Sequence, residues 1–425
     1  MSAYARRVVD DFLDEFQPEL AALEIHGAKA VGKTVTASRR ARTDLRLDLP
    51  ADAERLRADP RILATLPGPV LIDEWSRLPE SWDLVRRAVD EGALPGRFIL
   101  TGSATVPKGV QVHSGAGRIV RLRMRPMTIE ERGVSAATVS LGACLSGDGT
   151  PTGHTDMRLA DYVEEIVGSG FPAIRARSGR VRQMLLDSYL EDLVEREFPE
   201  QGVVVRKPQV LRAWMAAYAA ATGTTASYNR IMEASTPGEG EKPGKAATTT
   251  YRDVLAGLWM LDPLLAWSPT HNRLERLAQA PKHFLADPAL ACRLLRVNAH
   301  QLLAGDQGKG GDNLREGTLL GSLFENLATL CVRVAAQAAD ADVFHMRTYG
   351  GDHEIDMIVL TKDGQVMPIE VKLSQSVVDG DVRHIRWLRE KLGGDCLDGM
   401  VITTGEYAYR RADGVAVVPL GLLGH

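Results

Sequence analysis

The sequence predicts an α/β fold that begins with a parallel sheet wrapped by helices. Short apolar runs in residues 1–140 alternate with helical segments, which is the pattern of parallel strands joined by helical crossovers. The expected strands are Leu23–His26, Leu45–Leu49, Val70–Ile72, Phe98–Leu100 and Ile119–Met124. Three of these runs lead directly into polar motifs, and those motifs decide what the sheet is expected to do.

The first motif follows the first expected strand. It is the loop Gly27-Ala28-Lys29-Ala30-Val31-Gly32-Lys33-Thr34, which matches the pattern G-x-x-x-x-G-K-[ST]. In this pattern the glycines let backbone N–H groups face phosphate oxygens, the lysine reaches the terminal phosphates and the threonine hydroxyl binds Mg²⁺. A helix after Thr34 would add the positive end of its dipole. We therefore expect all eight residues to form an ATP or GTP site; the alternative is a glycine loop without this role.

The second and third motifs end two further strands. Val70–Ile72 is followed by Asp73 and Glu74, and an apolar run that ends in acids is typical of a Walker B strand. Asp73 is expected to hold Mg²⁺ with Thr34, and Glu74 to polarise the attacking water. After Phe98–Leu100, Ser103 is suited to sensing the γ-phosphate. Taken alone the two acids fit an exposed strand end equally well, but together with the loop they predict a nucleotide hydrolase core.

Length and composition narrow the class of protein. A chain of 425 residues is expected to form two or three domains, and its net charge of −4 gives no overall basic field that would indicate nucleic acid. The cysteines lack ligand-like spacing and predict reduced thiols rather than disulfides or a zinc site. They are Cys144, Cys292, Cys331 and Cys396. With no signal-like segment and no uncharged apolar run of membrane-spanning length, we expect a cytoplasmic protein.

The middle of the chain is expected to be helical. After the ATPase core of residues 1–140, residues 141–206 are expected to form a lid-like helical region that starts with a flexible Gly-rich loop, and residues 207–300 a winged-helix-like region. Three helices, Val210–Ala221, Ala226–Ala234 and Thr248–Leu255, precede an expected hairpin from Leu258–Leu261 to Leu264–Trp267. The third helix would contact a duplex, with Arg252 as its basic side chain. The alternative, which we weigh equally, is that the region only joins domains.

Residues 312–425 are expected to form a second α/β domain with its own cluster of charges. A helix carries Glu325, and two strands, Glu354–Leu360 and Val366–Lys372, are joined by a tight turn. This hairpin would bring Asp356 and Glu370 together, with Lys372 on the face of Glu370. Two carboxylates and a lysine suit Mg²⁺-dependent phosphodiester cleavage: Asp356 and Glu370 would bind the metal, and Lys372 would orient the water. The alternative is an ordinary hairpin with exposed charges.

The order and spacing of these motifs resemble a widespread bacterial and archaeal family of P-loop ATPases related to the AAA superclass, whose C-terminal domain of unknown function resembles PD-(D/E)xK nucleases. The resemblance covers nearly the whole chain. It rests on Gly27–Thr34, Leu71–Glu74, Leu100–Ser103, Gly117-Arg118, Gly170-Phe171-Pro172, Pro281-Lys282, Asp287–Leu290, Phe324-Glu325-Asn326, Glu354-Ile355-Asp356 and Ile369–Lys372. One departure is Ala28-Lys29, where relatives tend to carry Pro-Arg, and it leaves Gly32-Lys33-Thr34 intact.

The resemblance implies an ATP-binding ATPase core of the RecA/AAA type, a winged-helix-like middle and a nuclease-like end. Arg118 matches the family's Gly-Arg and is a candidate arginine finger; a structural ion pair is the alternative. The favoured function is an ATPase coupled to binding or cleavage of DNA or RNA. The competing one is an ATP-controlled regulatory or scaffold protein whose C-terminal domain only binds DNA or a partner, which includes a neighbouring copy in a homo-oligomer.

Overall fold

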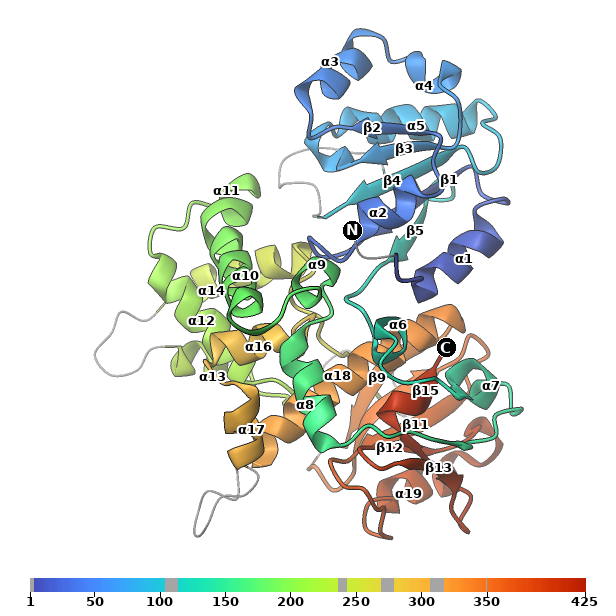
Figure 1. Cartoon of the computed structure of the whole chain (residues 1–425), viewed down its shortest axis with the longest axis vertical. Coiled ribbons are helices and arrows are strands. Elements are labelled where there is room, and N and C mark those ends of the chain that lie inside the picture. Colours follow the sequence, from blue (N-terminus) through green and yellow to red (C-terminus); the bar gives the residue numbers. More distant parts are fainter. Residues whose placement is uncertain (1–3, 104–113, 236–242, 269–278, 306–316, 349) are drawn as a thin grey trace.

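The computed structural model shows three units joined by a shared core. It describes residues 4–103, 114–235, 243–268, 279–305, 317–348 and 350–425, with the backbone alone at 317 and 318. In Figure 1 the N-terminal sheet lies at the top, a helical unit at the left and a C-terminal mixed sheet at the bottom. The expected start of the last domain, residue 312, lies outside the described residues.

The N-terminal unit is the expected parallel sheet. Its five strands run in the order β2-β3-β4-β1-β5, and every neighbouring pair is parallel. The strands are β1 (Ala22–His26), β2 (Thr43–Arg46), β3 (Val70–Asp73), β4 (Phe98–Gly102) and β5 (Val120–Arg123). Strand β2 ends earlier than expected, because Pro50 opens the next helix and Leu49 becomes the residue before that helix.

Helices cover both faces of this sheet. They are α1 (Val8–Phe16), α2 (Lys33–Ser38), α3 (Pro50–Ala58), α4 (Ile62–Thr65), the short η1 (Trp75–Arg77) and α5 (Glu80–Asp90). Alternate strand residues enter two separate apolar clusters: Leu71 and Ile99 belong to one, and Ile72 and Leu100 to the other. Burial on both faces explains why the strands are apolar throughout. The carboxyl ends of β1, β3 and β4 meet at one edge.

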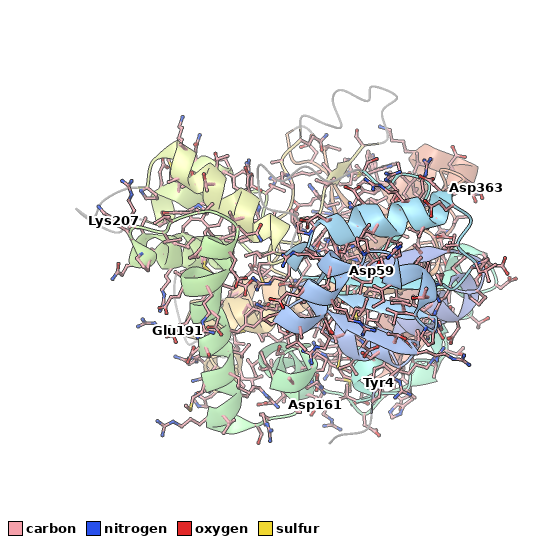
Figure 2. The ribbon with its side chains drawn as sticks, turned by 90° about the horizontal axis from the view of Figure 1, so that it is seen from above. Tyr4, Asp59, Asp161, Glu191, Lys207 and Asp363 are labelled. Atoms are coloured by element: carbon pink, nitrogen blue, oxygen red, sulfur yellow. The ribbon has the colours of Figure 1, made fainter. Side chains whose placement is uncertain are left out.

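The middle of the chain is helical, as expected. Seen from above, this unit, which carries Glu191 and Lys207, stands beside the N-terminal unit with Asp59 (Figure 2). Its helices are α8 (Leu159–Gly168), α9 (Pro172–Arg175), α10 (Gly179–Asp192), η2 (Leu193–Glu197), α11 (Phe198–Glu200), α12 (Pro208–Ala220), α13 (Tyr228–Ala234), α14 (Lys245–Gly257), α16 (Pro288–Leu294) and α17 (Ala299–Gly305).

The three helices of the expected winged-helix region form, but the predicted hairpin does not. Leu261 pairs with Leu285 and Leu264 pairs with Lys282, both antiparallel, so each half of the expected hairpin finds its partner farther along the chain. Strand β8 (Ala266–Trp267) then leaves the helical unit and joins the C-terminal sheet. Arg252 on α14 is already engaged, with Asp253 at 3.4 Å and with the ring of Tyr228.

The C-terminal unit is a mixed sheet of eight strands in the order β7-β13-β14-β12-β11-β10-β9-β8. Besides β8 it contains β7 (Gly153–His154), β9 (Asp342–Arg347), β10 (Glu354–Leu360), β11 (Val366–Val371), β12 (Met400–Thr403), β13 (Tyr407–Arg410) and β14 (Ala416–Pro419). Helices α18 (Gly317–Ala338) and α19 (Arg383–Leu392) pack on it, with the short η3 (Gly393–Asp395) and η4 (Leu420–Leu422).

Residues 139–154 belong to this C-terminal unit, which corrects two expectations. The stretch was expected to open a lid-like region with a flexible loop. Instead it forms β6 (Val139–Ser140), α7 (Leu141–Leu145) and β7. Strand β6 pairs with β15 (Leu423–Gly424), and β7 pairs with β13. The reason is burial: Leu141 and Cys144 enter the main core, and α7 packs on α18. Before it, α6 (Ile129–Arg132) follows the N-terminal sheet.

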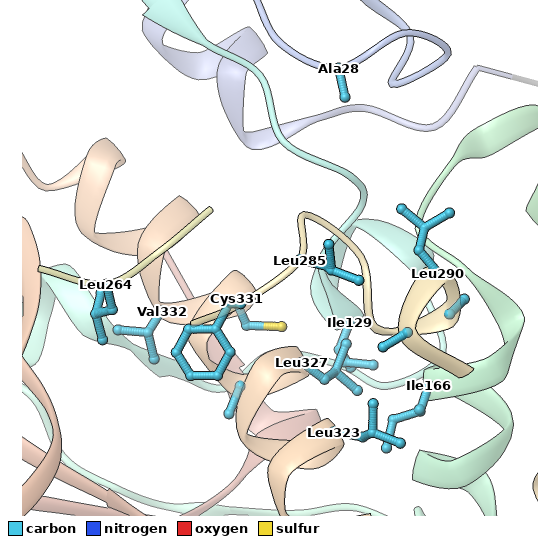
Figure 3. Packing of buried hydrophobic residues seen from close by; sticks show 14 of the residues in the cluster. Ala28, Ile129, Ile166, Leu264, Leu285, Leu290, Leu323, Leu327, Cys331 and Val332 are labelled. Atoms are coloured by element: carbon cyan, nitrogen blue, oxygen red, sulfur yellow. The ribbon is translucent and has the colours of Figure 1, made fainter. Parts of the chain in front are cut away.

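Helix α18 is the centre of the molecule. Figure 3 shows its residues Leu323, Leu327 and Cys331 beside Ile129, Ile166, Leu285 and Leu290, which come from all parts of the chain. The stretch Leu319–Ala338 is long and apolar enough to cross a membrane by length and composition. However, 67% of an 18-residue segment within it is buried inside the structure. Packing in a shared core therefore accounts for its apolar character. All four cysteines are free, as expected.

A buried carboxylate also joins the units. Asp262, between α14 and β8, accepts from Arg123 of β5 at 2.9 Å, from Arg125 at 2.9 Å and from Arg333 of α18 at 2.7 Å. Burial opposes ionisation of Asp262, but the three arginines outweigh it and hold the pKa of the carboxyl well below its usual value. One acid of the helical unit thus ties the N-terminal unit to helix α18 of the C-terminal unit.

Candidate functional site

The loop Gly27–Thr34 lies between β1 and α2, where the sequence predicts it. Gly27 has φ +152°, and a Cβ there would lie 2.1 Å from the carbonyl oxygen of Met124, so only glycine fits. Gly32 has φ +107° and begins helix α2. Ala30 also adopts a positive φ of 66°. This curled backbone is the conformation that a phosphate-binding loop requires.

Lys33 is the buried cation of the loop. It is 5% exposed, and its Nζ donates to the carbonyl oxygens of Gly27 and Ala28, both at 2.8 Å. Burial lowers the pKa of Lys33 to about 8, although Glu74 and Asp73 act against that shift. A buried ammonium held only by carbonyl oxygens lacks the full compensation that an anion would give. The site therefore fits a phosphate group.

Asp73 and Thr34 meet beside Lys33, at the carboxyl end of β3. Thr34 Oγ1 donates to Asp73 Oδ1 at 2.8 Å, and Thr101 Oγ1 donates to the same oxygen. Asp73 is 3% exposed. A hydroxyl and a carboxylate oxygen side by side are the ligand types that Mg²⁺ takes together with phosphate oxygens. The two residues therefore fit the ion that the motif implies.

Glu74 and Ser103 lie at the same edge. Ser103 Oγ is 3.0 and 3.1 Å from the two carboxylate oxygens of Glu74, and so holds that carboxylate in place. Glu74 itself has φ +52°, a left-handed conformation that is costly for a residue with a side chain. Such strain is concentrated at functional sites, and here it turns the carboxylate out of the strand.

The helical unit reaches over the loop, which the sequence did not reveal. Lys29 forms an ion pair with Glu197 of η2, and Tyr189 Oη donates to the carbonyl oxygen of Lys29 at 3.2 Å. A cavity of about 160 Å³ lies between the two units. It is lined by Lys29, Ala30, Ser103, Tyr189, Asp192, Leu193, Arg196, Glu197 and Leu258. Segment η2 is a π-helix directly before the short helix α11, and this helix form is frequent at functional sites.

Arg118 does not lie at this edge. It precedes β5, at the end of the sheet opposite to the loop, because β5 runs parallel to β1. Its Nε pairs with Asp90 at 2.8 Å, and the side chain is 45% exposed. This is the structural ion pair that the sequence left open as the alternative. Within one chain Arg118 does not reach the phosphate loop, so a role as an arginine finger would need a second copy.

The second group of candidate residues lies in the hairpin of β10 and β11. The strands pair with Met357 opposite Ile369, which sets Asp356 opposite Glu370 as predicted. Asp356 Oδ2 accepts from the N–H of Val371 at 2.9 Å, and Lys372 Nζ donates to Glu370 Oε2 at 2.9 Å. The expected grouping is therefore present, and the catalytic and metal-binding roles of these residues stay predictions.

The charges of this pair are set by burial. Glu370 is 4% exposed, and burial followed by the neighbouring Asp356 carboxylate raises the pKa of Glu370 to about 8. Among the described residues, no donor forms a hydrogen bond with Glu370 Oε1. A proton shared with Asp356 would give this oxygen a hydrogen bond. Burial opposes ionisation of Asp356 too, but Lys282 and Lys372 keep the pKa of Asp356 below its usual value. Burial and the nearby charges thus shift the pKa values of the two acids in opposite directions.

Lys282 completes the cluster and was missed as a site residue. Its Nζ lies 2.5 Å from Glu325 Oε1, 2.9 Å from Asp356 Oδ1 and 3.9 Å from Glu354 Oε1. Glu325, which the sequence places on a helix of this domain, thus lies within the cluster, and burial raises its pKa to about 8. Burial alone would lower the pKa of Lys282, but Asp356 and Glu325 raise it above its usual value.

Among the described residues, no three His, Cys, Asp or Glu side chains are arranged to hold a metal ion. The carboxylates Glu325, Asp356 and Glu370 come close to one another, but ammonium groups stand among them. The sequence contained Lys282 in the pair Pro281-Lys282, yet no local pattern connects it with acids that are 43 and 74 residues away.

Comparison with known proteins divides the chain in the same way. Residues 21–132 match the model of an AAA domain, residues 159–301 a domain of unknown function (DUF8612), and residues 320–423 another domain of unknown function (DUF4143). The N-terminal unit, with its phosphate-binding loop pattern, thus matches an AAA domain. The matches do not extend to the nuclease resemblance, which stays a prediction.

Two curated proteins are similar over most of this chain. Two uncharacterized proteins, Rv2008c of Mycobacterium tuberculosis and Mb2031c of Mycobacterium bovis, are each 26% identical over 375 residues, which is 87% of this chain and 72% of each relative. Among solved structures, the Walker-type ATPase PABY2304 of Pyrococcus abyssi is similar with a TM-score of 0.38 and 15% identity, over 66% of this chain and 93% of that one.

Proposed function

We propose that the chain is a magnesium-dependent ATPase whose nucleotide site is shared between the P-loop domain and the helical unit. The observation that carries this proposal is the buried Lys33 ammonium. It lies in a loop that only glycine can form at Gly27, and Thr34 and Asp73 lie at the same edge of the sheet. A bound triphosphate would supply the anion that this buried cation lacks.

The residues of the edge have separate tasks in this proposal. Lys33 exchanges its two carbonyl oxygens for phosphate oxygens, and Thr34 and Asp73 hold Mg²⁺, which supplies the charge that stabilises the transferring phosphoryl group. Glu74 accepts a hydrogen bond from the attacking water, and Ser103 keeps the Glu74 carboxylate in position. The contacts of Lys29 with Glu197 and Tyr189 pass a change in the loop to the helical unit.

The test compares ATP binding and hydrolysis in the wild type and Lys33→Ala, with Mg²⁺ and with a chelator. Lys33→Ala should weaken ATP binding about 100-fold, because hydrogen bonds to charged groups contribute about 1.5–3 kcal/mol each. Lys362→Ala is the matched control, since Lys362 is 67% exposed and pairs only loosely with Asp342. Unchanged ATP affinity in Lys33→Ala would remove the loop from the proposal.

For the C-terminal unit, two functions follow from the sequence: metal-dependent cleavage of nucleic acid, or binding of DNA or a partner without cleavage. The ion pairs of Lys282 favour binding without cleavage, because metal-dependent cleavage needs carboxylates that are free to hold a cation. The measurement is cleavage of plasmid and single-stranded DNA and of RNA with Mg²⁺ or Mn²⁺, with and without ATP, alongside binding of the same nucleic acids. Cleavage that Glu370→Gln abolishes would decide for the nuclease.

A further inference from the structure

The carboxylate cluster of the C-terminal unit already contains a cation that is part of the chain. Lys282 is 2% exposed, and its ammonium lies between Glu325 of α18 and Asp356 of β10. The lysine itself comes from the helical unit. Its position is therefore an interface between units and not a feature of the hairpin alone.

The backbone around Lys282 is fixed. The N–H of Lys282 donates to Leu264 at 2.9 Å, and the N–H of Leu264 donates back at 2.8 Å. The next residue, His283, is fully buried and donates its N–H to Thr224. Gly223, in the same turn, approaches Glu325 so closely that a Cβ would lie 3.2 Å from Glu325 Oε2. Lys282 is thus held over the carboxylates from two sides.

The ammonium occupies the space that a divalent ion would need. Magnesium binds oxygen at about 2.0–2.1 Å and calcium at about 2.3–2.6 Å, so an ion shared by Glu325 and Asp356 would lie between their oxygens. Lys282 Nζ contacts both carboxylates there, at 2.5 and 2.9 Å. A metal ion and this ammonium cannot share the place, because they would overlap and their charges repel.

The carboxylate cluster is not shut off from ions in solvent. A cavity of about 470 Å³ borders the cluster at Glu354 and Arg347 and is also lined by Gly223, Thr225 and Arg230. Small ions in solvent can therefore approach Glu354, which is 39% exposed and lies 3.9 Å from Lys282. The centre differs from a metal site because its positive charge comes from Lys282, a residue of the chain itself.

We propose that Lys282 replaces the divalent cation in this centre: the native C-terminal unit takes up no catalytic metal, and removal of the Lys282 ammonium opens a divalent-cation site between Glu325 and Asp356. The resemblance to metal-dependent nucleases thus does not extend to a bound metal ion. The carboxylates serve to dock the helical unit onto the C-terminal unit through Lys282. This inference is independent of ATP hydrolysis, because it concerns residues remote from the phosphate loop.

The experiment measures Mn²⁺ binding to the full chain by electron paramagnetic resonance, without nucleotide. Every protein carries Asp73→Asn, so that the carboxylate expected to hold Mg²⁺ beside the phosphate loop is removed from all of them. The proteins are this background, Asp356→Asn alone, Lys282→Ala, Lys282→Ala with Asp356→Asn, and Lys362→Ala as a control that removes an exposed lysine. Lys282→Ala should bind one Mn²⁺ at least ~10-fold more tightly than the background, because the competing charge is gone. Asp356→Asn should abolish that gain, and Lys362→Ala should show none.

Two outcomes would overturn the proposal. The first is a background protein that binds one Mn²⁺ which Asp356→Asn alone removes, since the native centre would then be a metal site. The second is a folded Lys282→Ala protein that gains no Mn²⁺. Lys282→Met, which keeps the apolar stem, replaces Lys282→Ala if the latter does not fold. The melting temperature gives a second readout: Mn²⁺ should raise it in the Lys282 variant and leave the background unchanged.

Discussion

At the scale of single residues, Glu74 separates nucleotide binding from hydrolysis. Its carboxylate lies beside Lys33 and Asp73 but accepts a hydrogen bond only from Ser103 among the described side chains, so it is available to a water molecule. Glu74→Gln keeps the shape and removes the base. We expect ATP to bind with Mg²⁺ as in the wild type and turnover to fall by about 10²–10⁴-fold. Equilibrium binding and single-turnover hydrolysis, measured on one preparation, test the unchanged affinity and the slower turnover. Wild-type turnover in Glu74→Gln would contradict the role assigned to Glu74.

His26, the last residue of β1, makes stability depend on pH. Burial lowers the pKa of His26 to about 3, and nearby arginines add to the shift; its ring lies 4.5 Å from that of Trp259. Between about pH 6.5 and pH 3 the unfolded chain binds a proton at His26 that the native state excludes. The contribution of His26 to the free energy of unfolding is thus fully present above about pH 6.5. It is lost as the pH falls, by up to about 1.4 kcal/mol per pH unit.

The variant His26→Gln isolates this contribution. The loss of unfolding free energy between pH 7 and pH 4 should be smaller in His26→Gln than in the wild type, because glutamine does not titrate. Urea unfolding at a series of pH values measures the difference. Equal pH dependence in the two proteins would mean that His26 is protonated in the native state at acid pH.

At the scale of elements, η2 contacts the phosphate loop and lines the cavity beside it. Glu197 on η2 is largely buried and pairs with Lys29, so it places a negative charge next to the nucleotide pocket. Glu197→Gln removes this charge and releases Lys29 toward the phosphates. We expect ATP affinity to rise by about 3- to 10-fold, since a charge–charge contact in a partly buried site contributes about 1 kcal/mol or more.

Glu195→Gln on the same element is the control for that prediction. Glu195 is 64% exposed and lies 3.6 Å from Arg212, so its loss should leave ATP affinity unchanged. Titration calorimetry at low and high salt compares the two variants, and the gain in Glu197→Gln should shrink with salt. A weaker ATP affinity in Glu197→Gln would show instead that the Lys29–Glu197 pair holds the loop open for the nucleotide.

The elements also show which parts of the site the sequence could predict. The loop Gly27–Thr34 and the hairpin of Asp356 and Glu370 were predictable, because neighbouring residues determine each of them. Lys282 was not, since its partner Glu325 is 43 residues away and its other partner Asp356 is 74 away. The two-residue strand β7 was missed for the same reason, because a distant strand holds it. Strand β8 lies within the segment expected as one half of a hairpin, but its partner is the distant β9.

At the scale of the whole molecule, a shared core couples the units. Helix α18 contributes Leu323 and Leu327 to a cluster that also contains Ile25 of the P-loop strand and Tyr218 of the helical unit. Because protein interiors are densely packed, a displacement at one end of such a core is transmitted to the other.

The polar counterpart of this core is Asp262, whose replacement should loosen all three units together. Asp262→Asn leaves Arg123, Arg125 and Arg333 buried without their common carboxylate. Removing one partner of a buried ion pair costs about 3–5 kcal/mol, and we expect a loss of this size in the free energy of unfolding.

Asp342→Asn, at an acid that is 65% exposed, is the control and should change stability by less than about 0.5 kcal/mol. Calorimetry should show one transition in the wild type and either a lower or a split transition in Asp262→Asn, because Arg123 and Arg125 belong to the N-terminal unit, Arg333 to helix α18 of the C-terminal unit, and the acid to the helical unit. A wild-type melting curve in Asp262→Asn would mean that the apolar core alone holds the units together.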